Sequence, residues 1–299
     1  MFKNCRRLRV PARACLLVTL TLCAACAGAR GPEAARPRAN EPVYPVTLVA
    51  NAERREQTLN AWQTLAQAQG LSAAPTPELQ SVTATVAALP PGFAPRLPKV
   101  EIAPALQSGK DEETREALRR FIATAAPLLG STPRDLSLVE LRDGPNGTKV
   151  ARYRQKPFPH PLRGGYGTVE ISFDADGRVT SITSTALPDT ERLARALAAQ
   201  PPKLTAEDAA TRLRGRAVTY TDAANVTQTL TVSQSEPLTT RELVVYPVAR
   251  AGEPPVIELH LAWEVPVGSG DNPVRAYVDA VTGDIIAAAL PPPQRTRVQ

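Results

Sequence analysis

The spacing of apolar residues changes from helical to alternating twice along the chain, and this repeated order restricts the folds that the chain can adopt. The first helical pattern begins at Asp111 and is closed by Pro127 and Gly130. Its apolar residues at helical spacing are Leu118, Phe121, Ile122 and Ala125. Two hairpin patterns follow, with strands expected at residues 136–142, 149–155, 169–173 and 178–185.

The same order begins again near residue 189. Thr205 is a suitable helix N-cap because an acidic residue, Asp208, follows three positions later. Helices are therefore expected at residues 189–199 and 205–213, and strands at residues 227–234, 242–248, 256–265, 274–279 and 284–289. Because helical segments precede an antiparallel meander in both halves, the sequence predicts an α+β fold with two helix-on-antiparallel-sheet modules in tandem.

The segment before these modules is less regular. Residues 27–42 are rich in Pro, Ala, Gly and Arg without apolar periodicity, so we expect a disordered tether. A helical pattern then runs from an N-cap at Asn51 to about residue 69. Its apolar stripe is Leu59, Trp62, Leu65 and Ala66. Residues 72–105 are rich in Pro and Ala, which predicts a linker with at most a short strand near residues 82–86.

The N-terminus differs from the rest of the chain in charge and in cysteine content. All four cysteines lie within the first 26 residues, where five basic residues and no acidic one precede an apolar run at residues 14–25. This run is shorter than the ~20 residues of a membrane-spanning helix, and it is typical of an export signal. It ends in Leu-Cys-Ala-Ala-Cys26, which resembles the lipobox of bacterial lipoproteins. The resemblance implies a lipid on Cys26, with ordinary signal cleavage as the alternative, and Ala27 in place of Asp favours the outer membrane.

Removal of residues 1–26 would leave 30 basic and 29 acidic residues and no cysteine except Cys26. The net charge of +6 therefore comes mainly from the export signal. We expect no basic surface for nucleic acid on the mature chain, and binding that changes little with salt. Disulfides, thiolate zinc sites and cysteine nucleophiles are excluded from the mature domain.

Several longer stretches resemble known families. PLLGSTPRDLSLVELRDGPNGTKVARYRQ (127–155) and GTVEISFDADGRVTSITSTALP (167–188) are similar to the fungalysin/thermolysin propeptide (FTP) domain. LHLAWEVPV (259–267) and VRAYVDAVTGDIIAAAL (274–290) resemble the PepSY domain, which follows the FTP domain in precursors of thermolysin-like metallopeptidases. In such precursors these domains assist folding of the peptidase and block its cleft until they are cleaved.

The resemblance covers about residues 111–290, and the peptidase would begin just where this chain ends. It therefore implies a free-standing, propeptide-like module. The resulting domain division is an export signal (1–26), a tether (27–50), an N-terminal helix with its linker (51–105), an FTP-like module (106–190), a PepSY-like module (191–290) and a tail (291–299).

The chain offers little catalytic chemistry. The two histidines, His160 and His260, are too far apart for the His-Glu-x-x-His motif of thermolysin-like peptidases. On an alternating strand, His260 would share a face with Glu258 and Glu264, so a weak metal site is one alternative and a solvated polar face is the favoured interpretation. No motif supports a Ser-His-Asp triad.

Two glycine-containing loops have functional alternatives. The Asp174 to Gly177 turn begins like a calcium loop, but Thr185 stands where the twelfth-position Glu is needed, so a hairpin turn is predicted. The run Arg-Gly-Gly-Tyr-Gly at residues 163–167 is an alternative anion cradle, but it leads into a strand and lacks a helix N-terminus, so a flexible loop is predicted.

We therefore predict a non-catalytic protein without cofactor or metal, which binds a protein partner as a peptidase inhibitor or folding chaperone. A thermolysin-like metallopeptidase is the expected partner, and nucleic acid is not expected. The loop that departs from the FTP pattern would make the contact through Phe158, His160, Leu162 and Tyr166, and as a loop tip it should contribute little to stability. The alternatives are an envelope scaffold that has lost contact with a peptidase, and an unrecognised hydrolase.

Overall fold

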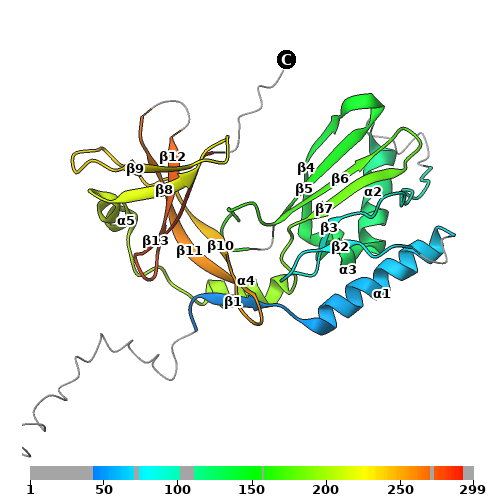
Figure 1. Cartoon of the computed structure of the whole chain (residues 1–299), viewed down its shortest axis with the longest axis horizontal. Coiled ribbons are helices and arrows are strands. Elements are labelled where there is room, and N and C mark those ends of the chain that lie inside the picture. Colours follow the sequence, from blue (N-terminus) through cyan, green and yellow to red (C-terminus); the bar gives the residue numbers. More distant parts are fainter. Residues whose placement is uncertain (1–42, 71–73, 102–110, 157, 270–272, 292–299) are drawn as a thin grey trace, which may run out of the picture. The chain divides into compact units, whose positions relative to one another are not determined.

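The computed structural model describes residues 43–70, 74–101, 111–156, 158–269 and 273–291, which form helices and antiparallel sheets (Figure 1). The predicted α+β class is confirmed. All described residues belong to one compact unit. The export signal and Cys26 lie outside the described residues. Within the described ranges, no helix has the length and apolar character needed to cross a membrane.

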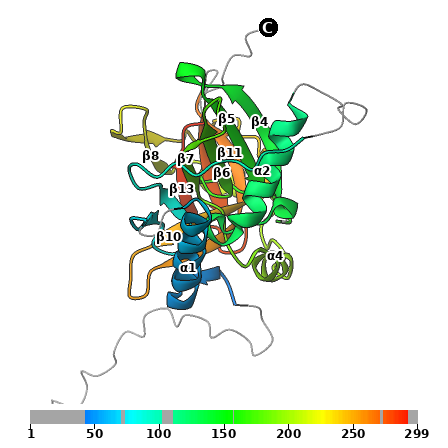
Figure 2. The same ribbon diagram turned by 90° about the vertical axis from the view of Figure 1, so that its right-hand side faces the viewer.

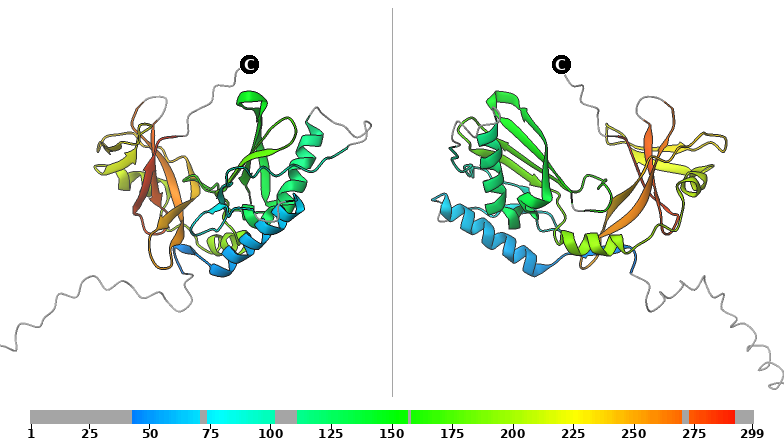
Figure 3. Two further views of the ribbon diagram at one scale, coloured as in Figure 1. Left: turned by 45° about the vertical axis from the view of Figure 1, so that its right-hand side comes forward. Right: turned by 180° about the vertical axis from the view of Figure 1, so that it is seen from behind.

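The first sheet has four antiparallel strands in chain order. They are β4 (Leu136–Asp143), β5 (Lys149–Gln155), β6 (Thr168–Phe173) and β7 (Val179–Ser184). The two predicted hairpins are confirmed. α2 (Glu112–Thr124) lies across one face of this sheet, as Figure 2 and Figure 3 show, and α3 (Ala126–Leu129) follows it. Gly130 ends α3 with a φ of 68°, the left-handed conformation that glycine adopts without strain.

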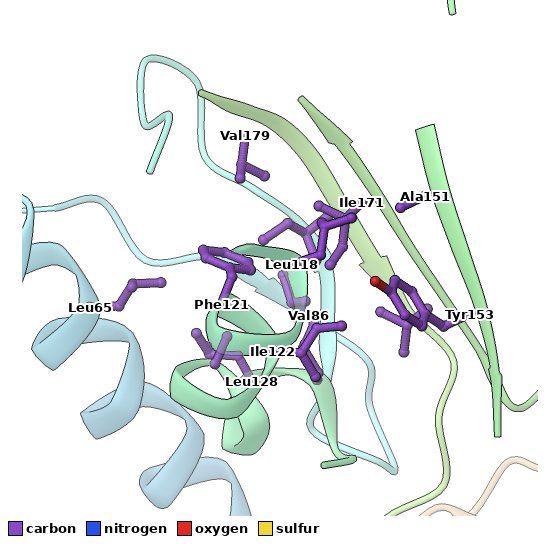
Figure 4. Packing of buried hydrophobic residues seen from close by; sticks show 14 of the residues in the cluster. Leu65, Val86, Leu118, Phe121, Ile122, Leu128, Ala151, Tyr153, Ile171 and Val179 are labelled. Carbon is purple, nitrogen blue, oxygen red and sulfur yellow. The ribbon is translucent and has the colours of Figure 1, made fainter. Parts of the chain in front are cut away.

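The core of this part of the molecule lies between α2 and the four-stranded sheet (Figure 4). Leu118, Phe121 and Ile122 of α2 are at most 2% exposed. They pack in one cluster with Ile171 and Val179 of the sheet. Burial of each such side chain contributes about 1.5–3 kcal/mol to the free energy of unfolding. The helical spacing of these residues thus identified the buried face of α2.

α1 (Ala52–Ala68) confirms the predicted N-terminal helix. The side chain of Asn51 accepts hydrogen bonds from the backbone N–H groups of Glu53 and Arg54, as expected of an N-cap. Trp62 is 2% exposed, and its ring centroid lies 4.2 Å from that of Phe93. α1 is therefore joined to the same core.

The prediction of a linker at residues 72–105 is wrong for its described part, residues 74–101. β2 (Glu78–Leu79) pairs with β3 (Val86–Ala88), and Val86 is buried with Phe93 in the core beneath α2. The segment packs through a few apolar residues set among Pro and Ala. Such isolated residues leave no periodic pattern in the sequence, which is why a linker was predicted.

The second sheet has five antiparallel strands around a central strand, β11 (Val256–Val267). β10 (Glu242–Arg250) pairs along one edge of β11. β1 (Val46–Val49) and β12 (Val274–Asp279) pair with successive parts of the other edge, and β13 (Ile285–Ala289) pairs with β12.

α4 (Thr190–Ala198) and α5 (Ala206–Leu213) precede β8 (Ala217–Thr221) and β9 (Thr227–Thr231), which form a separate hairpin. The capping box predicted at Thr205 is confirmed. β8 was not predicted, because only one of its five residues, Val218, is buried.

The predicted tether at residues 27–50 is wrong for residues 46–49. These residues form β1, which pairs with β11, and Val46 and Leu48 are 5% and 0% exposed. A four-residue strand is too short to show a secure alternation in the sequence. Its position was therefore decided by a pairing with residues more than two hundred positions away.

Candidate functional site

β11 is buried on both faces. Leu259, Leu261 and Val265 face apolar clusters, whereas His260 and Glu264 on the opposite face are 7% and 0% exposed. The predicted solvated polar face is therefore wrong. We call this side of the five-stranded sheet the polar face. By strand register it carries Glu242, Val244 and Tyr246 of β10, His260, Ala262 and Glu264 of β11, and Arg275, Tyr277 and Asp279 of β12.

The loop at residues 158–166 docks on the edge of β10 and reaches the polar face. The backbone N–H of Val245 donates to the carbonyl of Pro161 (3.0 Å), and the backbone N–H of Arg163 donates to the carbonyl of Val245 (3.0 Å). Leu162 is 6% exposed and belongs to the apolar cluster that contains Val245. The prediction of an exposed, flexible loop tip is therefore wrong at Leu162, because the loop completes the hydrogen bonding of a strand edge.

Glu264 is the centre of an ion-pair cluster on the polar face. Its carboxylate oxygens lie 2.9 Å from Nε of Arg163, 3.1 Å from Arg241 and 3.5 Å from Arg275. Arg163 also pairs with Glu242. Burial lowers the pKa of Arg163, but the hydrogen bond and charge of Glu264 and the charge of Glu242 outweigh that effect and raise it. The buried carboxylate of Glu264 is thus compensated by guanidinium groups that stay charged.

Two tyrosines stack beside this cluster. The rings of Tyr246 and Tyr277 have centroids 4.3 Å apart and are tilted by 38°. Burial raises the pKa of Tyr246, and burial together with the charge of Glu264 raises the pKa of Tyr277 to about 12. Both hydroxyls therefore stay protonated at neutral pH and can donate a hydrogen bond.

A cleft of about 670 Å³ opens between this cluster, the docked loop and the ends of β5 and β6. We call it the arginine cleft. It is lined by Arg154, Arg163, Arg241 and Arg275, by Tyr166, Tyr246 and Tyr277, and by smaller or apolar residues that include Leu162, Ala289 and Leu290. No acidic side chain is among the described residues that line it. Gly164, with a φ of 67°, lets the loop backbone approach Tyr246, because a Cβ at this position would lie 3.2 Å from the ring.

A larger groove, of about 890 Å³, lies among α1, α3 and α4. Its lining carries four acidic and three basic side chains, and its Arg54 is already paired with Asp189 at 2.9 Å. The groove therefore offers no excess of one charge. We take the smaller arginine cleft as the candidate site, because its lining selects a ligand by charge.

A second polar network surrounds His260. Oδ2 of Asp279 accepts a hydrogen bond from the hydroxyl of Tyr44 (2.8 Å) and lies 2.7 Å from Nδ1 of His260. Nε2 of His260 lies 3.3 Å from Glu258. Burial and the neighbouring Asp279 raise the pKa of Tyr44, so its hydroxyl remains a donor. Both ring nitrogens of His260 face carboxylates, and the network connects Tyr44, two residues before β1, to β11 and β12.

The alternatives that involved His260 and Glu264 do not match this geometry. The carboxylate of Glu264 is held by arginines and does not join Glu258 and His260 in one cluster. Among the described residues, no group of three or more His, Cys, Asp or Glu side chains is arranged so that it could hold a metal ion. The predicted hairpin turn at Asp174 is confirmed, since its side chain accepts from the N–H groups of Asp176 and Arg178.

The structure separates the four predicted partner-binding residues. Leu162 and Tyr166 line the arginine cleft, whereas Phe158 and His160 do not. Phe158 packs against the apolar cluster of Leu162, and burial lowers the pKa of His160. Sequence reasoning missed the arginines at positions 154, 241 and 275, because they come from separate strands and turns and share no motif.

Comparisons with known proteins identify no family. No family model matches the chain, and no curated protein matches it. Among solved structures, the Bacillus megaterium YpeB C-terminal domain is similar, with 10% sequence identity and a TM-score of 0.30 over 82% of this chain and 99% of that chain. We base no conclusion on a similarity at this level. The resemblance to FTP and PepSY domains therefore stays a prediction from the sequence.

Proposed function

We propose that this protein is a non-catalytic binding module that holds a protein partner in the arginine cleft. The observation that carries the proposal is the lining of the cleft, in which four arginines and three tyrosines surround a hollow of about 670 Å³. Arginine and tyrosine are enriched among the residues that contribute most to binding at protein interfaces.

The side chains of the cleft are suited to binding and orienting a ligand. Guanidinium groups donate hydrogen bonds and stay charged, and Tyr277, with a pKa near 12, is a neutral donor. Neither group accepts a proton at neutral pH. The proposal therefore assigns to the cleft a role in recognition.

We also propose, from the resemblance to FTP and PepSY domains, that the partner is a thermolysin-like metallopeptidase that the module inhibits or helps to fold. Lipid attachment at Cys26 would hold the module at the cell envelope, with the outer membrane favoured. Cys26→Ser is expected to release the processed protein from membranes. Continued sedimentation of that processed variant with membranes would contradict the anchor.

The full chain, purified in detergent, should co-elute with a thermolysin-like peptidase from the same cell and slow its hydrolysis of casein. The matched variants each remove two exposed arginine charges, either from the cleft (Arg154→Gln with Arg241→Gln) or from elsewhere (Arg178→Gln with Arg216→Gln). Only the cleft pair should weaken the complex. If both double variants capture the peptidase as fully as wild type does, the contact lies outside the cleft. Failure of the wild-type chain to bind or inhibit the peptidase would exclude that partner and favour an envelope scaffold.

A further inference from the structure

We propose that the arginine cleft recognises carboxylates and binds an acidic segment of a polypeptide. This inference rests on the proposed function, since it names the chemistry of the partner segment that the cleft takes. It assigns the binding of these carboxylates to Arg154, Arg241 and Arg275.

The charges around the cleft do not cancel. Arg163, Arg241 and Arg275 share two carboxylates, those of Glu242 and Glu264, so one positive charge remains. Arg154 is exposed on β5 and has no ion pair within the described part of the chain, and it adds a second positive charge. The cleft is therefore locally cationic, although the mature chain as a whole is close to neutral.

These arginines also have free donors. A guanidinium group carries five N–H donors in a planar fork. Arg241 and Arg275 each use one terminal nitrogen on Glu264, and their side chains are 51% and 21% exposed. The donors that remain can form paired hydrogen bonds with a further carboxylate.

Glu264 holds these arginines in place before any ligand binds. Its carboxylate receives three guanidinium groups at 2.9–3.5 Å, which fixes side chains that would otherwise lose about 2 kcal/mol of rotamer freedom each on binding. Arg163 is the most restrained of them, because it also pairs with Glu242 and donates to the carbonyl of Leu162. A pre-ordered set of donors binds its ligand with a smaller entropic cost.

The size and the remaining lining favour a peptide over a small inorganic anion. A volume of about 670 Å³ is in the range of clefts that enclose drug-sized ligands, and a phosphate ion would leave most of it empty. Leu162, Ala289 and Leu290 add apolar contact, and Tyr166 and Tyr246 add ring surface with a hydroxyl at its end. Arginine beside tyrosine suits a chain that alternates carboxylates with apolar or small groups.

The test measures the binding of a fluorescein-labelled peptide of alternating glutamate and glycine to the full chain in detergent, by fluorescence polarisation. The same peptide with glutamine in place of glutamate is the ligand control. The glutamate peptide should bind at least about tenfold more tightly, because each charge-assisted hydrogen bond is roughly twice as strong as a neutral one. Equal binding of the two peptides would overturn the proposal.

The same pairs of variants locate the site. Arg154→Gln with Arg241→Gln should weaken binding of the glutamate peptide by about tenfold or more, and Arg178→Gln with Arg216→Gln should leave it unchanged. Thermal unfolding of each variant, followed by circular dichroism, separates lost binding from lost folding. If the cleft pair stays folded and binds the peptide like wild type, the assignment is wrong. If the cleft pair unfolds, the single variant Arg154→Gln, at an exposed and unpaired position, is tested in its place. Peptide binding like that of wild type in this variant would likewise show that the assignment is wrong.

Sodium phosphate supplies the third arm. It should displace the peptide only at the ionic strength at which sodium chloride does, through general screening. Displacement by phosphate at an ionic strength where chloride has no effect would assign the cleft to an inorganic anion and overturn the peptide assignment. A chain that captures the peptidase but ignores the glutamate peptide would refute this inference and leave the proposed function standing. A chain that binds the glutamate peptide but captures no peptidase would refute the proposed peptidase partner and leave this inference standing.

Discussion

One face of the four-stranded sheet and the polar face of the five-stranded sheet are both buried, but their chemistry is opposite. α2 covers the four-stranded sheet with Leu118, Phe121 and Ile122, which form a continuous apolar core. The polar face instead buries Glu264 and Asp279, both at 0% exposure. Loss of an apolar side chain costs its transfer free energy and leaves a cavity, whereas loss of a buried charge leaves its charged partners without compensation. The stability of the polar face should therefore depend on complete ion pairs, and that of the apolar core on close packing.

The largest expected effect is that of Glu264→Ala. It would leave Arg163 and Arg275, whose side chains are 16% and 21% exposed, without their shared carboxylate. We expect a loss of about 3–5 kcal/mol in the free energy of unfolding, measured by urea denaturation. Glu116→Ala is the matched control, because Glu116 also pairs with two arginines but lies on the exposed surface of α2. Its loss should be below about 1 kcal/mol, and similar losses in both variants would show that the burial of Glu264 adds nothing to the cost of removing its carboxylate.

The second effect concerns the docked loop. Leu162→Ala should lower the free energy of unfolding by about 2–5 kcal/mol, because Leu162 is 6% exposed within the apolar cluster behind β10. Val139→Ala, at a position that is 53% exposed on β4, should change it by less than about 0.5 kcal/mol. A Leu162→Ala variant as stable as Val139→Ala would restore the original prediction of a free loop tip.

Elements with many local signals were predictable from the sequence, and those fixed by distant pairing were not. α2 and the hairpins around it follow from spacing and turn residues within a short window. β1 depends on β11, and the core contacts of residues 74–101 depend on α1 and α2. Neither segment contains a pattern of its own that identifies its partner, so composition alone suggested a tether and a linker.

The candidate site was less predictable than the fold. The alternation of β11 placed His260 and Glu264 on one face, but only strand register shows that Tyr277 lies opposite Glu264. The loop contact of Arg163 with Glu264 joins residues 101 positions apart. The near balance of charges over the mature chain also gives no sign of a local excess of arginine. The weak salt dependence expected from the net charge therefore does not follow for binding in the arginine cleft.

The third prediction concerns acid stability of the polar face. Burial raises the pKa of Asp279, but hydrogen bonds from His260, Thr282, Val281 and Tyr44 outweigh this and hold the pKa below its usual 3.8. A carboxyl with a depressed folded-state pKa stabilises the fold above its unfolded-state pKa, and this contribution is lost as the pH falls through the folded-state value.

The free energy of unfolding should therefore fall more steeply in this acid range for wild type than for Asp279→Asn, which cannot titrate at this position. Urea denaturation at a series of pH values gives both slopes. Because the comparison uses slopes, a lower stability of Asp279→Asn at neutral pH does not affect it. Parallel curves would show that Asp279 contributes nothing to acid unfolding.

The smallest expected effect separates stability from binding within the polar face itself. Arg241 contacts Glu264 through one nitrogen and its side chain is 51% exposed, so Arg241→Gln should lower the free energy of unfolding by less than about 1 kcal/mol. Arg163→Gln, at a side chain that is 16% exposed and bound to two carboxylates, should cost several times more. Binding of the glutamate peptide should nevertheless weaken in Arg241→Gln, because Arg241 contacts Glu264 through one nitrogen only and its other donors remain free for a ligand. A variant that loses stability and binding in equal measure would show that Arg241 acts through the fold, and the distinction between a supporting and a recognising arginine would have to be abandoned.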